Sequence, residues 1–193
     1  MAITSAKTGS SFTNLIKYDN FNTYNPPYIP SSFESIATVT ASGGETSLNF
    51  TSIPGTYKSL QIRGYFLSSG GGGGSMRLNS DTGSNYARHY LGGNGSSVFA
   101  AGSATQTLMF TADQSGTTYS SVVLIDIIDY ASTSKYKTMR AWNGYDTNSA
   151  GGSTYLYSGL WQSTSAVTSI QLGTGNFGGT FAAGSTFALY GVK

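Results

Sequence analysis

The chain has 193 residues, which is long enough for one domain with a sizeable core and an additional arm. Its formal net charge is +2, and only 9% of its residues are charged. Its ten basic residues are scattered, which argues against a nucleic-acid partner. Cysteine is absent, and this excludes a disulfide framework, a thiol nucleophile and a thiolate metal site.

No segment approaches the roughly 18 apolar residues that a membrane-spanning helix needs, so no membrane partner is expected. The first seven residues, MAITSAK, lack the apolar segment of a signal peptide. Together with the absence of cysteine, this favours synthesis and folding in a reducing cytoplasm.

The first 32 residues have no sustained helical or strand period. Three of the four prolines, Pro26, Pro27 and Pro30, lie near their end and favour extended backbone. The apolar residues before them cannot be buried within so short a segment, so they need another surface. We predict an extended N-terminal arm over residues 1–32, which packs on its own domain or, as we expect, on a neighbouring subunit. Its anchoring side chains would be Phe12, Leu15, Ile16, Tyr18, Phe21 and Tyr24.

Residues 33–193 have the composition and periodicity of a strand-rich domain. Aromatic residues make up 13% of the chain, and its 26 glycines argue against long helices. The segment 122–128 is apolar on both faces, which is typical of a central strand. The five glycines at 70–74 predict a flexible loop. Further strands are predicted near residues 36–41, 48–52, 60–66, 76–78, 86–91, 105–111, 136–142, 155–161, 167–172 and 186–192.

These strands and the turn signals between them predict an all-β fold. The expected architecture is an antiparallel β-sandwich, jelly-roll-like, that follows the N-terminal arm.

Two motifs resemble those of enzymes, but their surroundings do not fit catalysis. Asp81 begins the D-T-G-S sequence of aspartic proteases, which need two aspartates that share a proton, and the chain has one copy. We interpret it as a turn in which Gly83 supplies a positive φ. The G-x-G-x-x-G match at 173–178 is followed by a glycine-rich segment too short for the helix that binds a pyrophosphate.

The acidic residues and the one histidine also offer no reaction centre. His89 has no second histidine within the chain with which to bind a metal ion or build a serine triad. Asp126 and Asp129 lie on opposite faces of a strand, so they cannot act as a catalytic pair. Asp126 is expected to pair with Arg140 or Lys137, or else to bind calcium. We therefore expect no enzymatic activity, no catalytic residues and no cofactor.

The fourteen tyrosines and two tryptophans are the candidates for recognition. Tyr145, Tyr155, Tyr157 and Trp161 lie near glycine-rich loops, and the last three share one face of a strand. This pattern fits a sugar-stacking face, an intersubunit face or an ordinary core, and the sequence does not choose between them.

Three segments resemble a family of tailed-bacteriophage virion proteins. They are residues 76–86 (MRLNSDTGSNY), 129–138 (DYASTSKYKT) and 187–193 (FALYGVK). In that family an R-F-N-x-D-T-G-x-N-Y turn, a D-Y-x-S-T-x-K-x-K segment and a final L-Y-G-I-K recur; here Leu78 replaces Phe and Val192 replaces Ile. The resemblance covers residues 35–193 and not the arm. It implies a multimeric β-sandwich structural protein, and members are named as head, tail or fibre components.

We therefore expect a bacteriophage virion structural protein located in the particle. The favoured role is a capsid decoration (cement) protein that binds other virion proteins, such as capsid or tail subunits, through its arm and forms a homotrimer. The alternative is a tail or fibre component that binds a host-surface glycan.

Overall fold

The computed structural model describes residues 32–193, except residues 70–71, 117 and 149–150. The described chain forms one compact unit from Ser32 to Lys193. The predicted arm and its six anchoring side chains lie outside the described residues.

The described chain consists of strands joined by turns and one short 3₁₀ turn. The strands are β1 (Phe33–Thr40), β2 (Ser47–Phe50), β3 (Ser59–Phe66), β4 (Gly72–Leu78), β5 (Tyr86–Gly93), β6 (Val98–Gln106), β7 (Met109–Ser115), β8 (Ser121–Ile128), β9 (Lys137–Asp146), β10 (Gly152–Trp161), β11 (Ile170–Thr174) and β12 (Thr186–Val192), and the 3₁₀ turn η2 is Gly175–Phe177.

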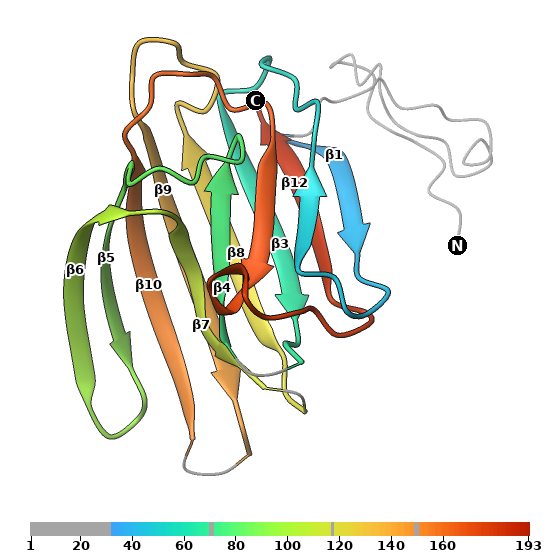
Figure 1. Ribbon diagram of the computed structural model, residues 1–193, viewed down its shortest axis with the longest axis vertical. Helices are drawn as coiled ribbons and strands as arrows, with labels where there is room; N and C mark the ends of the chain where they lie inside the picture. Colours follow the sequence, from blue (N-terminus) through green and yellow to red (C-terminus); the bar gives the residue numbers. More distant parts are fainter. Residues whose placement is uncertain (1–31, 70–71, 117, 149–150) are drawn as a thin grey trace, which may run out of the picture. The chain divides into compact units, whose positions relative to one another are not determined.

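Two antiparallel sheets pack face to face, which confirms the predicted all-β sandwich (Figure 1). The large sheet has eight strands in the order β1-β12-β3-β8-β9-β10-β5-β6, and the small sheet has four in the order β2-β11-β4-β7. The chain's last strand, β12, was predicted near residues 186–192 and pairs with both β1 and β3. No helix in the described part is long and apolar enough to cross a membrane.

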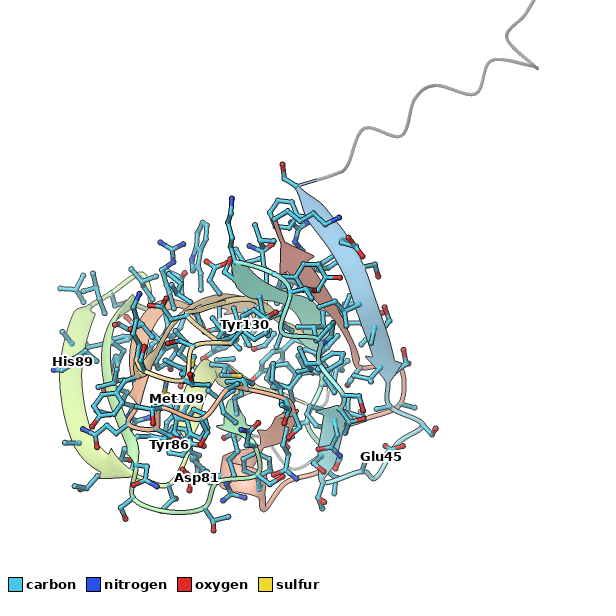
Figure 2. All side chains as sticks on the ribbon, turned by 90° about the horizontal axis from the view of Figure 1, so that it is seen from above. Glu45, Asp81, Tyr86, His89, Met109 and Tyr130 are labelled. Carbon is cyan, nitrogen blue, oxygen red and sulfur yellow. The ribbon has the colours of Figure 1, made fainter. Side chains whose placement is uncertain are left out.

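The core lies between the sheets because alternate residues of each strand point inward. In β8 these are Val123, Ile125 and Ile127, which are at most 2% exposed. Figure 2 shows Met109, Tyr86 and Tyr130 in this interior, whereas His89 lies on the outside. Each fully buried side chain of this kind stabilises the fold by roughly 1.5–3 kcal/mol before the cost of ordering it.

The glycine-rich segment differs from its prediction, because Gly72, Gly73 and Gly74 form the start of β4 and not a loop. The reason is close packing between β4 and β7. A Cβ atom at Gly73 would lie 2.6 Å from the carbonyl oxygen of Ala112, and one at Gly74 would lie 2.8 Å from Oγ1 of Thr111. Glycine is therefore required here for the approach of two strands.

The predicted strand at 105–111 is in fact the junction of two strands. β6 ends at Gln106 in the large sheet, and β7 begins at Met109 in the small sheet. Thr105 has a φ of 58°, a left-handed conformation that interrupts the extended backbone before the chain changes sheets. Most of β6 was not predicted, because its Ala, Gly and Ser residues have little of the usual strand signal.

We predict that Gly73→Ala destabilises the protein by at least about 2 kcal/mol, because the added methyl group meets backbone and cannot be accommodated by a rotamer change. Gly144→Ala is the matched control, since a Cβ there would lie 3.8 Å from its nearest neighbour. Denaturant unfolding of both variants measures the difference. Equal stability of the two variants would contradict the packing role given to Gly73.

Candidate functional site

The outer face of the large sheet, which points away from the small sheet, is the most unusual surface of the described chain. The outward residues of β8 are Val122, Leu124, Asp126 and Ile128, so three of the four are apolar. β8 was predicted to be a central strand that is apolar on both faces, and its place within the large sheet confirms the central position. No described segment covers its outer side.

Aligned strands join these residues into cross-strand rows. In the central row Leu124 lies opposite Trp142, Trp142 opposite Leu156, and Leu156 opposite Leu91. Ala100 of β6 extends the row to the edge of the sheet. The apolar surface therefore crosses five neighbouring strands without interruption.

The exposed apolar side chains of the described chain gather almost entirely on this face. Trp142 is 63% exposed and Val122 62% exposed. Monomeric proteins rarely leave a continuous apolar surface of this kind in contact with water. Of the nine large apolar side chains that are exposed in the described chain, eight point outward from the large sheet: Phe33, Tyr65, Leu91, Val98, Val122, Ile128, Trp142 and Leu156.

The outward side of the small sheet provides an internal comparison. There Asn49, Gln171 and Arg77 lie opposite one another in a single cross-strand row. The guanidinium of Arg77 lies 4.2 Å from the centre of the Phe177 ring, so this aromatic residue is partly covered. The small sheet thus has the polar outer surface expected of a solvated face, and the large sheet does not.

Trp142 stands between two hollows on the outer face. The first, of about 450 Å³, is lined by residues that include Arg63, Val122 and Thr154, and the second, of about 220 Å³, by residues that include Asp126 and Arg140. The indole N–H of Trp142 donates a hydrogen bond of 3.2 Å to Oγ1 of Thr154, which fixes the orientation of the ring.

A series of hydrogen-bonded polar side chains borders the apolar rows. The side chain of Arg63 donates to that of Gln61, Gln61 donates to Asp126, and Arg140 donates to the second oxygen of Asp126, each at 2.7 Å. Of the two partners predicted for Asp126, Arg140 and Lys137, the structure shows the pair with Arg140. The side chain of Arg140 is 66% exposed, so this pair contributes little stability and mainly orients the arginine.

Among the residues that the structure describes, no three His, Asp or Glu side chains lie close enough together to hold a metal ion.

The predicted recognition residues on β10 lie on the inner face, so that hypothesis was wrong for Tyr157 and Trp161. They are 4% and 2% exposed. Tyr155 also points inward, half-buried, with its ring centre 5.5 Å from that of Tyr157. Tyr145, at the end of β9, is half-buried and stacks on Tyr119. The exposed aromatic residue of this region is Trp142, which faces the same side as Leu156.

The segments that carry the phage-protein resemblance make contacts that hold the fold together. The carboxylate of Asp81 accepts hydrogen bonds from the backbone N–H of Gly83, from Asn85 and from the indole N–H of Trp161. Burial acts to raise the pKa of Asp81, but these hydrogen bonds outweigh it and hold the pKa below its usual value. The structure thus supports the interpretation of this motif as a turn.

The prediction that Gly83 has a positive φ was wrong. The left-handed residues of the turn are Asn79 and Ser80, with φ of 51° and 56°. A Cβ at position 83 would lie 2.7 Å from the side-chain nitrogen of Asn85, so a larger residue there would displace the Asn85 side chain.

The second segment surrounds a buried lysine. Lys137 is 1% exposed, and its ammonium group donates hydrogen bonds to the carbonyl oxygens of Ser132, Lys135 and Ser163. Burial lowers the pKa of Lys137, while the nearby charge of Asp129 opposes this effect. Lys137 therefore fastens two loops to the start of β9 and is not available to a ligand.

We predict that the protein loses stability above pH 10. Burial raises the pKa of Tyr86 to about 12 and also raises the pKa of Tyr157. Between pH 10 and 12 the unfolded chain has lost a phenolic proton that the folded protein keeps, so stability falls as pH rises, by about 2–3 kcal/mol for Tyr86 alone. Denaturant unfolding at several alkaline pH values measures this, with phenolate absorbance followed in parallel. Tyrosine ionisation that is complete near pH 10 without loss of strand structure would contradict it.

Comparison with known proteins adds no family to this description. No protein-family model, no curated protein and no solved structure matches the chain.

Proposed function

We propose that the protein is a structural component of a bacteriophage particle, specifically a capsid decoration (cement) protein. In this role it lies on other virion proteins, held by the outer face of its large sheet and by its N-terminal arm. The observation that carries the assembly role is the concentration of exposed apolar side chains on one sheet face. The resemblance of residues 76–86, 129–138 and 187–193 to phage virion proteins supports the choice of particle.

The outer face also indicates the chemistry of its partner. Its apolar rows are bordered by Arg63 and Arg140, and His89 lies in the same cross-strand row as Arg140. The carboxylate of Asp126 balances only part of this positive charge. A protein surface with an apolar centre and carboxylates at its rim would therefore complement the face in both shape and charge.

The energetics suit a permanent structural contact. Burying an exposed side chain such as Trp142, Leu156 or Val122 contributes on the order of 1.5–3 kcal/mol before the costs of association. Apolar side chains in the arm, such as Phe12 and Ile16, would add to this by the same mechanism. Two weak contacts on one chain reinforce each other, because the second forms at a high effective concentration once the first exists.

We predict that the combined substitution Val122→Thr, Trp142→Thr and Leu156→Thr reduces decoration of particles at least about tenfold, since a loss of 1.4 kcal/mol already has this effect. The substitutions keep good strand formers and remove exposed apolar groups, together with the indole hydrogen bond to Thr154. The measurement adds full-length protein to particles that lack it and quantifies the bound protein. Asn49→Ala with Gln171→Ala, on the small sheet, is the matched control and should bind fully.

A second variant tests the arm in the same assay. Phe12→Ser, Ile16→Ser and Phe21→Ser should also lower occupancy while leaving the unfolding transition of the domain unchanged. Wild-type occupancy of the sheet variant would contradict docking by the outer face. Wild-type occupancy of the arm variant would contradict anchoring by the arm. Failure of the unmodified protein to bind any particle would overturn the decoration role.

Trp142 favours one alternative, a tail or fibre component that binds a host-surface glycan. An exposed indole beside hollows lined by Arg63, Asp126 and Arg140 combines a flat stacking surface with hydrogen-bonding groups. A glycan-array signal of the purified protein that is lost in Trp142→Ala and kept in Asn49→Ala would support this role. The absence of any signal for the unmodified protein would exclude it for the glycans tested.

A further inference from the structure

The large sheet ends at β6, whose outer edge pairs with no other strand in the described chain. An unpaired edge presents a row of backbone N–H and C=O groups that can pair with another chain. Proteins usually block such edges with charged residues, prolines, bulges or short strands. The four sheet edges of this protein can therefore be compared for these features.

Three of the four edges carry such protection. β1 has Glu34, which pairs with Lys193, and an irregular register between Ser35 and Ala37. β2 is only four residues long, and β7 contains Asp113. β6 differs from all three, because its nine residues include no charged residue and no proline.

The one irregularity of β6 lies at its end. The pairing with β5 shifts register between Tyr86 and Arg88, where Ala104 and Thr105 of β6 lie opposite one residue of β5. Val98 to Ser103 pair regularly with β5 before this point. This leaves a regularly paired, uncharged edge with the sequence V-F-A-A-G-S, in which Val98 is 85% exposed.

We propose that β6 pairs antiparallel with β6 of a second copy of this chain, across a two-fold axis. A two-fold axis perpendicular to the sheet makes a strand antiparallel to its own copy, so the same edge of two copies can form one continuous antiparallel sheet. Pairing a strand with itself places like residues near each other, which is unfavourable for charged strands. β6 avoids this repulsion because it has no charged residue.

The side chains of β6 fit the same arrangement. Ala100 and Gly102 point to the outer face, and the outward residues of one copy must lie opposite outward residues of the other. Pairing therefore brings small side chains together without steric conflict. It also continues the row from Leu124 to Ala100 into the second copy, so that two apolar outer faces form one surface. The pairing does not depend on the phage assignment, and it favours a two-fold dimer over the expected homotrimer.

The absence of native cysteine makes this contact directly testable by disulfide trapping. Full-length Ala100→Cys and Ala101→Cys variants are oxidised separately, because the two-fold axis can pass beside either residue. Residue 100 lies next to its own copy in one of these two registers, and residue 101 does so in the other. Directly opposed residues of antiparallel strands have Cα atoms about 4.5–5.5 Å apart, within the range of a disulfide. We expect a cross-linked dimer from one of the two variants. Thr38→Cys, an exposed outward position on β1, is the control and should give none.

Sedimentation of the full chain provides the second measurement. The unmodified protein should be a dimer, and Ala100→Lys should weaken the dimer at least about tenfold, by placing two ammonium groups close to the axis. Thr38→Lys should leave it unchanged. An unmodified protein that is a monomer or a trimer, or a dimer that Ala100→Lys does not weaken, would overturn the proposal. Dissociation by Ala100→Lys with no cross-link from either cysteine variant would also overturn the proposal. Loss of the dimer when Phe12, Ile16 and Phe21 in the arm are changed to Ser would overturn it as well.

Discussion

The alternation of side chains along a β-strand links the core of this protein to its surface. Eight strands form the large sheet and four form the small one, and both pack against each other through one face only. Each inward core residue of the large sheet therefore has neighbours that point outward. In β8 to β10 many of these neighbours are apolar, as Val122, Trp142 and Leu156 show. A sandwich that is complete inside thus retains a second apolar surface outside.

The polar residues of the chain divide into those that hold the fold and those that define the surface. Asp81 and Lys137 are directed inward and bind backbone groups or Trp161, so the segments of the phage-protein resemblance preserve the architecture. Arg63 and Arg140 lie on the outer face beside the apolar rows. The fold-holding contacts of Asp81 and Lys137 and the apolar rows of the outer face therefore involve different residues, and each supports a different part of the proposed function.

The fold was largely predictable from the sequence, but the site was not. Alternation and turn signals identified most strands and the central place of β8, and the sequence named Arg140 as one of the candidate partners of Asp126. Alternation cannot tell which of two apolar faces is covered, because that depends on the second sheet. For this reason Tyr157 and Trp161 were candidates for recognition, while Trp142 on the neighbouring strand was missed. The register that places Trp142 opposite Leu156 is a long-range property, which one strand's sequence does not contain. Glycine had a similar ambiguity, since Gly73 and Gly74 serve close strand packing where composition suggested a loop.

In the proposed assembly a partner surface covers the outer face of the large sheet. Hydroxyl-radical footprinting with mass spectrometry tests it most directly, by comparing the free protein with the protein bound to its particle. Oxidation of Trp142 should fall at least several-fold on binding, whereas oxidation of Phe177, beside the small sheet, should stay the same. Equal oxidation of Trp142 in the free and bound protein, or protection of Phe177 in its place, would contradict the account.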